Sequence, residues 1–107
     1  ILTERVLTGK YEVYLKVKKP DYLGQSMWEF KYEGKLIQAK IHDSGWLERF
    51  QQKTVLLGPG DSIRALVEVK VSYDKYGEVI ASHYTILNVK EIIQNPKGVQ
   101  QSLLIDL

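Results

Sequence analysis

Apolar and polar residues alternate along five stretches of the chain, the pattern expected of strands in a half-buried sheet. These stretches cover residues 3–18, 26–32, 35–42, 62–73 and 78–89. The apolar face of the first, from Tyr11 onward, consists of Tyr11, Val13, Leu15 and Val17, and that of the fourth consists of Ile63, Ala65, Val67, Val69 and Val71. In the fifth stretch the apolar positions change from even to odd residue numbers between Ile86 and Val89. This change predicts a β-bulge near Leu87 and Asn88.

The second and third stretches predict a hairpin, because only Glu33 and Gly34 separate them. A two-residue turn fixes the register. The expected pairs are Tyr32 with Lys35, Phe30 with Ile37, and Trp28 with Ala39. This face is strongly apolar, so Trp28 and Phe30 are expected to pack in the core. The opposite face carries no aromatic residue and consists of Met27, Glu29, Lys31, Leu36, Gln38, Lys40 and His42.

One short helix is predicted between the third and fourth strands. Trp46, Leu47 and Phe50 fit one face of a helix over residues 46–53. Asp43 or Ser44 is expected to cap its N-terminus. The sequence Gly-Pro-Gly-Asp at residues 58–61 predicts a tight turn before the fourth strand.

The composition is that of a single soluble globular domain. The chain has 107 residues, a formal net charge of +2 and no cysteine. Disulfides, thiolate catalysis and cysteine-type zinc sites are therefore excluded within this sequence. A charge this small does not by itself indicate a nucleic-acid or membrane partner. No apolar run approaches the roughly 20 residues of a membrane span, and a cytoplasmic location is the simplest expectation.

The expected division is a β-barrel domain over residues 1–93 and a C-terminal tail over residues 94–107. The tail ends in the apolar segment 102–107, which would add an edge strand or contact a partner. The chain begins at Ile1 rather than Met, so we expect a part of a longer protein, although N-terminal processing would leave the same start.

The order strand, hairpin, helix, hairpin over about residues 3–90 resembles the OB-fold, a small five-stranded barrel. The resemblance implies an all-β, five- to six-stranded antiparallel barrel with one short helix between strands three and four. It does not imply a function, because one fold serves many functions. A second set of positions is similar to the C-terminal β-domain of uncharacterised bacterial and phage-borne proteins, a resemblance that brings no known activity. That set is Trp28, Phe30, Ile37, Ala39, Ile41, Asp43, Trp46, Leu47, Phe50, Pro59, Gly60, Asp61, Ile63, Tyr84, Ile86 and Val89.

Two loops carry the tyrosines and lysines that would suit single-stranded nucleic acid. Such binding uses exposed aromatic side chains for the bases and basic ones for the phosphates. The two loops are expected to border one cleft of an OB barrel, with the end of the first strand extending it. The candidate residues are Tyr14, Lys16, Lys18, Lys19, Tyr22, Tyr73, Lys75 and Tyr76. Asp21 and Asp74 lower the positive potential there, so this binding would be weak and salt-sensitive. The alternative is that these side chains simply keep strand ends soluble.

No catalytic residue, metal site or cofactor is predicted. His42, Asp43 and Ser44 are sequence neighbours whose side chains alternate between faces on a strand, so they cannot form a relay as neighbours. His83 is the second of two histidines, and no group has metal-ligand spacing. The turn at residues 58–61 lacks the Gly-Lys-Ser/Thr ending of a phosphate loop.

We therefore expect a non-catalytic accessory domain of a larger protein that mediates protein–protein contact or self-association. A strand edge or the C-terminal tail would make the contact. The alternative is a weak single-stranded nucleic-acid-binding OB domain.

Overall fold

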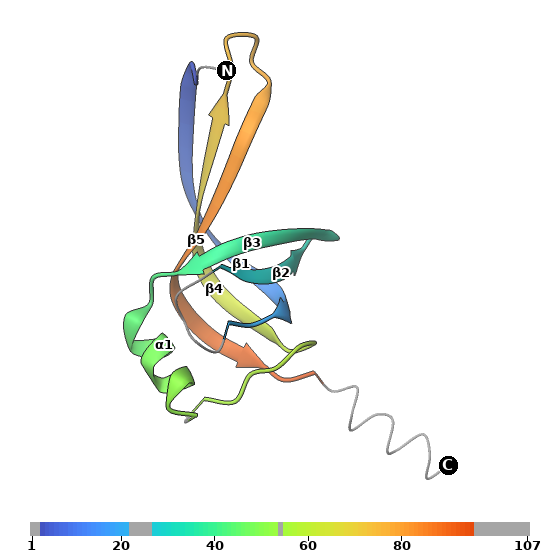
Figure 1. Cartoon of the computed structure of the whole chain (residues 1–107), viewed down its shortest axis with the longest axis vertical. Helices are drawn as coiled ribbons and strands as arrows, with labels where there is room; N and C mark the ends of the chain where they lie inside the picture. The colour runs from blue at the N-terminus through green and yellow to red at the C-terminus, as the bar shows by residue number, and fades with distance from the viewer. Residues whose placement is uncertain (1–2, 22–26, 54, 96–107) are drawn as a thin grey trace, which may run out of the picture.

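The computed structural model describes residues 3–21, 27–53 and 55–95, which form a closed five-stranded barrel with one short helix (Figure 1). The strands are β1 (Arg5–Lys19), β2 (Trp28–Tyr32), β3 (Lys35–Ile41), β4 (Ser62–Tyr73) and β5 (Val79–Ile93), and helix α1 (Ser44–Gln51) lies between β3 and β4. The predicted all-β fold and its order of elements are confirmed. Strand β5 continues four residues past the predicted end at Val89.

The strand order around the barrel is β1-β2-β3-β5-β4, and β4 closes the barrel by pairing with β1. All pairings are antiparallel except that of β3 with β5, which is parallel. The predicted antiparallel pairing is therefore confirmed for every pair of strands except this one. The cause is the crossover: α1 and β4 lie between β3 and β5 in the chain, so β5 arrives in the same direction as β3.

The β2–β3 hairpin has the predicted register. Trp28 pairs with Ala39, Phe30 with Ile37 and Tyr32 with Lys35. The turn residues Glu33 and Gly34 both have positive φ, 50° and 81°, as a two-residue type I′ turn requires. Trp28 and Phe30 are buried, as predicted.

Helix α1 covers the barrel with two aromatic side chains. Trp46 and Phe50 are buried against Trp28, at ring-centroid distances of 5.8 Å and 5.0 Å from it. The remaining buried side chains come from all five strands and from Leu57. The helix is held at its start by Asp43, whose side chain accepts a hydrogen bond from the backbone N–H of Trp46 at 3.1 Å. Of the two predicted caps, Asp43 is the one observed.

The predicted bulge in β5 is present at Leu87. Leu66 pairs with Asn88 and Val67 pairs with Ile86, which leaves Leu87 as the extra residue. The same Asp43 carboxylate that caps α1 accepts a hydrogen bond from the backbone N–H of Val89 at 2.9 Å. One side chain therefore joins the helix to the bulged strand.

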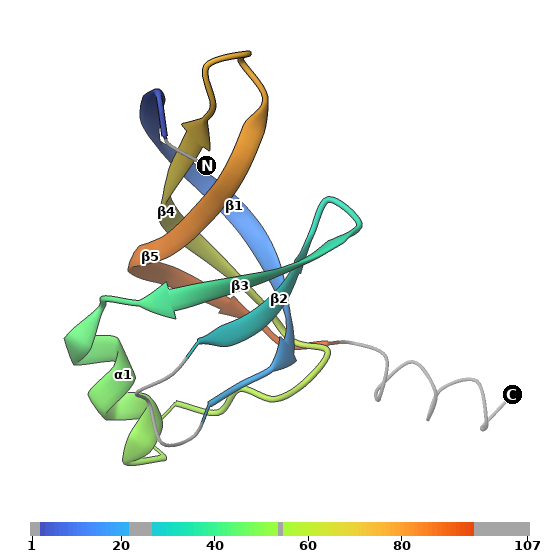
Figure 2. The same ribbon diagram turned by 45° about the horizontal axis from the view of Figure 1, so that its top comes forward.

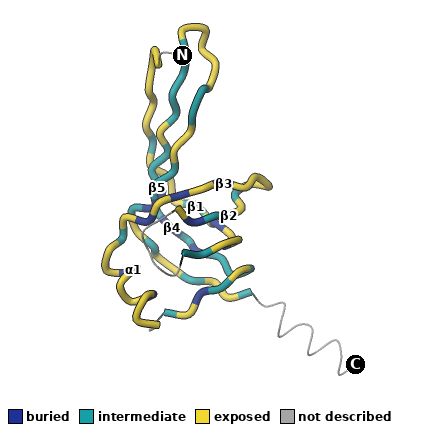
Figure 3. The backbone as a smooth tube through the Cα atoms, viewed as in Figure 1, coloured by how far each residue is buried: buried dark blue, intermediate teal, exposed yellow. Residues whose placement is uncertain are grey.

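Strands β1, β4 and β5 continue beyond the barrel as a three-stranded arm, defined by residues 5–11, 68–73 and 79–84, which joins the barrel where Tyr84 pairs with Ala39 (Figures 1 and 2). The apolar faces of β1 and β4 run into this arm, where no second layer formed by the described residues covers them. Tyr11 is therefore 56% exposed, and Val69 and Val71 are half-buried (Figure 3). The alternation therefore marks one face of the sheet, but the core ends below the arm, so Val69 and Val71 of this face are not fully buried.

Candidate interaction surfaces

The outer edge of β1 is open between Arg5 and Leu15. On one side β1 pairs with β4 from Arg5 to Lys16, whereas on the other it pairs with β2 only from Lys16 to Lys19. Within the described part of the chain, no strand pairs with the second side of residues 5–15. Alternate residues of this stretch therefore present backbone N–H and C=O groups to solvent, a template for another strand.

The open edge of β1 is long and regular. Natural edge strands are usually blunted by proline, by bulges, by charged side chains or by being short. Of these devices, the open edge of β1 carries charges at Arg5, Lys10 and Glu12. Residues 5–15 contain no proline, and the pairing of β1 with β4 continues from Arg5 to Lys16 without a register shift. The second open edge of the arm, residues 79–83 of β5, is shorter and contains a register shift opposite Ser72 and Tyr73. The β1 edge is therefore the one better suited to pairing.

The two faces of the arm differ in character. One face continues the apolar face of the barrel and the other is polar. The apolar face consists of Leu7, Gly9, Tyr11, Val69, Val71 and Tyr84, and the polar face of Thr8, Lys10, Glu12, Glu68, Lys70 and His83. A strand added at the β1 edge would extend both faces. It would lie beside apolar residues of β1 on one face and beside polar residues of β1 on the other.

Tyr11 lies over Gly9 on the apolar face. A Cβ placed on Gly9 would lie 2.5 Å from the Tyr11 hydroxyl oxygen and 2.8 Å from its ring carbon Cζ. At the base of the arm, Tyr11, Tyr32 and Tyr84 line a small apolar pocket together with Val69. Burial there raises the pKa of the Tyr32 hydroxyl above 10.0, and the Glu33 carboxylate adds to the shift.

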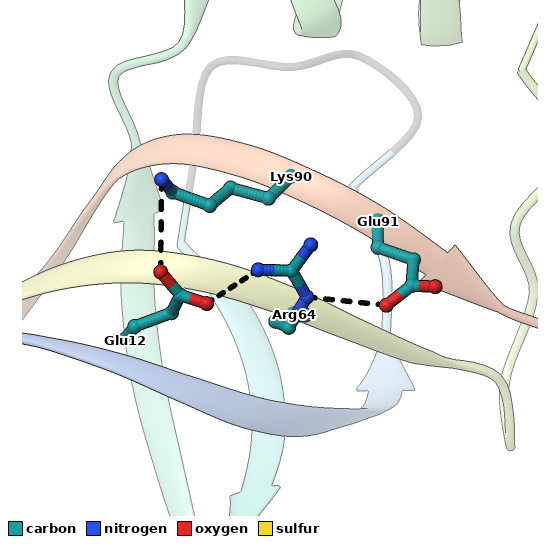
Figure 4. A network of polar contacts seen from close by, with 4 residues as sticks. All are labelled: Glu12, Arg64, Lys90 and Glu91. Atoms are coloured by element: carbon teal, nitrogen blue, oxygen red, sulfur yellow. Dashed lines mark hydrogen bonds and ion pairs between the residues drawn. The ribbon is translucent and has the colours of Figure 1, made fainter.

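A charged network lies on the outer face of the barrel where β1, β4 and β5 run side by side (Figure 4). The Arg64 guanidinium pairs with Glu12, and its Nε lies 3.1 Å from Oε1 of Glu91. Lys90 Nζ lies 3.6 Å from Oε2 of Glu12. The hydrogen bond from Arg64 lowers the pKa of the Glu12 carboxyl, and the bonds to Glu91 and Glu12 raise the pKa of Arg64. The two acids and two bases balance within the network, in which Glu12 also lies on the open edge of β1.

The predicted nucleic-acid residues fall into two groups that the structure does not bring together. Lys18 and Lys19 lie at one end of β1, whereas Tyr73 pairs with Arg5 at the other end, about 40 Å away along the strand. The expectation that both loops border one cleft was therefore wrong. The reason is the length of the arm, which carries the β4–β5 turn away from the barrel. Tyr22 lies outside the described residues.

At the tip of the arm, each tyrosine has a cation beside its ring. The Arg5 guanidinium lies 4.8 Å from the ring centroid of Tyr73, and Lys75 Nζ lies 5.2 Å from that of Tyr76. The Asp74 side chain accepts hydrogen bonds from the backbone N–H groups of Tyr76 and Glu78, at 2.8 Å and 3.0 Å. Asp74 thus shapes the turn and also reduces its positive charge.

The second group forms a basic surface at the β1–β2 contact. Lys16 lies directly opposite Lys31, and Tyr14, which is 61% exposed, precedes Lys16 by two residues on the same face. Like charges directly opposite each other destabilise a sheet. No described ion pair neutralises either lysine. Lys31 completes this surface but was not among the predicted site residues, because its closeness to Lys16 depends on the β1–β2 register.

The acidic residues that stood out in the sequence have structural roles. Asp43 caps α1, and the Asp61 carboxylate accepts hydrogen bonds from the backbone N–H groups of Gly58 and Asn95, at 2.9 Å and 2.7 Å. Among the residues that the structure describes, no three His, Cys, Asp or Glu side chains gather as a metal site would require. No helix in the described ranges is long and apolar enough to cross a membrane.

Comparison with protein-family models, with curated proteins and with solved structures found no significant match to this chain.

Proposed function

We propose that this chain is a non-catalytic interaction domain, an accessory part of a larger cytoplasmic protein, that pairs with an extended polypeptide segment along β1. The observation that supports the proposal most strongly is the open edge of residues 5–15. Strand addition gives affinity through main-chain hydrogen bonds and specificity through alternate side chains.

The two faces of the arm define the segment that would fit this edge. Residues on one side of the added strand would contact Leu7, Tyr11 and Val13, and residues on the other would face Lys10 and Glu12. The segment would therefore alternate apolar and polar residues, with charges placed to oppose Lys10 and Glu12.

Selection of peptides from a random library on the immobilised domain tests this proposal. We expect the selected peptides to alternate in polarity and to compete with one another for β1. Neighbouring residues of a strand point their N–H groups to opposite sides. Of the two variants Gly9→Pro and Lys10→Pro, one therefore removes an N–H from the open edge, and the other removes an N–H that bonds to β4. Loss of binding in the variant that stays folded would support the proposal. Undiminished binding in that variant would refute it.

The basic surface of Tyr14, Lys16, Lys18 and Lys31 supports a second candidate function, weak binding of single-stranded nucleic acid. The observation that favours it is the unneutralised pair Lys16 and Lys31 beside an exposed tyrosine. Bases would stack on the Tyr14 ring while the lysines contact phosphates.

Fluorescence anisotropy with a labelled single-stranded oligonucleotide, at low and at physiological salt, tests this second function. Lys16→Ala and Lys31→Ala should each weaken binding and lower the salt slope by about 0.7. Lys75→Ala, at the distant tip of the arm, should leave binding unchanged and is the matched control. Equal losses from all three variants would mean that charge alone is responsible and that this surface is not a site.

A further inference from the structure

We infer that the strand paired with β1 is β1 of a second copy of this chain, in an antiparallel register centred on Tyr11. This inference rests on the proposed function, because it names the occupant of the same open edge. It would join two arms into one continuous sheet in the order β5-β4-β1-β1-β4-β5. The contact is isologous: the same residues meet across a two-fold axis.

The two faces of the arm limit the registers that such a pair can adopt. An axis perpendicular to the sheet keeps the two apolar faces on the same side. Each residue then lies opposite a residue of the same face, so the axis passes midway between one residue of β1 and its own copy. The possible positions of the axis near the middle of the open edge are Gly9, Lys10, Tyr11 and Glu12.

Charge distinguishes these four registers. An axis at Lys10 or at Glu12 places that residue opposite its own copy, and like charges directly opposite are unfavourable. An axis at Gly9 places Lys10 opposite Thr8. Neither Lys10 nor Glu12 then lies opposite a residue of opposite charge in the other copy. An axis at Tyr11 places Lys10 of each copy opposite Glu12 of the other, which gives two pairs of opposite charge.

The same register brings favourable pairs onto the apolar face. Tyr11 meets Tyr11, and aromatic pairs across strands are stabilising. Leu7 meets Leu15. The pairing stops at these residues because β2 occupies the edge from Lys16 onward. The register therefore uses the open edge up to the point at which the barrel closes it.

Sedimentation velocity over a range of concentrations tests the association. We expect a reversible dimer whose dissociation constant rises roughly tenfold in Lys10→Glu, because both charge pairs become repulsive. Lys70→Glu is the matched control: it makes the same charge change on the same face but lies on β4, one strand in from the edge. A monomer even at about 1 mM, or equal effects of the two variants, would overturn the inference.

Disulfide cross-linking tests the register, because the chain contains no cysteine. Thr8→Cys protein mixed with Tyr14→Cys protein should form a cross-linked heterodimer, since these residues are opposite in the inferred register. Thr8→Cys alone should not cross-link, because its two copies would lie roughly 20 Å apart. Cross-linking of Thr8→Cys to Lys10→Cys or Glu12→Cys instead would show a different register and contradict the one inferred.

The outcomes separate this inference from the function on which it rests. A domain that stays monomeric but takes up selected peptides along β1 overturns the second copy as occupant and leaves the interaction function standing. A domain that neither dimerises nor binds peptides along β1 overturns both.

Discussion

Tyr11 covers Gly9, the residue two positions before it on the same strand, so closely that a Cβ on Gly9 would lie 2.5 Å from the tyrosine hydroxyl. This contact lies at the centre of the open edge of β1. It fills the gap that a glycine leaves in a strand, and it lays an aromatic ring along the apolar face of the arm.

The contact predicts coupling between the two residues. In a strand, glycine is less stable than alanine by roughly 0.5–1 kcal/mol. In the wild-type chain, Gly9→Ala should recover little of this difference in stability, because the new methyl group displaces the Tyr11 ring. In a Tyr11→Ala background the same change should stabilise the domain by about 0.5–1 kcal/mol. Urea unfolding of the four proteins measures both steps. Equal effects of Gly9→Ala in the two backgrounds would show that the ring does not restrict this position.

Trp28, on β2, packs against Trp46 and Phe50 of α1, and its removal should destabilise the domain strongly. Trp28→Ala is expected to lower the free energy of unfolding by about 3–5 kcal/mol, because it leaves a cavity against Trp46 and Phe50. Leu36→Ala, on the exposed face of the same hairpin, should have an effect within about 0.5 kcal/mol. Urea unfolding measures the loss of stability in both variants. Similar losses would mean that the face of the hairpin with Trp28 is no more buried than the face with Leu36.

Asp43 joins α1 to the bulge of β5, so its loss should affect two elements together. Asp43→Ala removes the cap of α1 and leaves the N–H of Val89 without its acceptor, which should cost about 2 kcal/mol. Ser44→Ala is the control, because Ser44 is the first residue of the helix and not its cap. Hydrogen exchange of the Val89 amide should accelerate in Asp43→Ala only. Unchanged exchange at Val89 would show that the link to β5 carries no stability.

The lowered pKa of Glu12 predicts that part of the stability of the domain is lost at acid pH. Its pKa in the folded state lies below the ordinary 4.5 because of the hydrogen bond from Arg64. The group therefore contributes stability that is fully present above pH 4.5 and is lost as the pH falls through the lowered value. Arg64→Gln should return the Glu12 pKa toward 4.5 in an NMR titration, whereas Lys40→Gln, outside the network, should not change it. A Glu12 titration that is the same in Arg64→Gln and the wild type would contradict this assignment.

The local chemistry of turns and strand periodicity allowed much of the fold to be predicted. Glu33 and Gly34 fixed the hairpin register, and the apolar side of that register identified Trp28 and Phe30 as core residues. The parity shift between Ile86 and Val89 located the bulge at Leu87. Each of these features is determined by residues close together in the sequence.

The candidate surfaces depend on relationships that the sequence alone does not contain. Alternation in β1 and β4 continues past the barrel, so nothing in the pattern of Tyr11 and Val71 marks where the core ends. The opposition of Lys16 and Lys31 depends on a register between strands that are joined by a loop rather than a tight turn. The predicted single cleft failed because the length of the arm, a property of the β4–β5 pairing, separates Tyr73 from Lys18.

Amide hydrogen exchange along β1, measured by NMR at low and at high protein concentration, shows whether the open edge of β1 takes up a second strand. In the dilute protein, protection should alternate between Arg5 and Leu15, because only the amides that face β4 are bonded. At high concentration we expect the remaining amides of residues 7–15, which face away from β4, to become protected as well. Unchanged alternation at every concentration, and in the presence of selected peptides, would show that the edge of β1 takes up no strand.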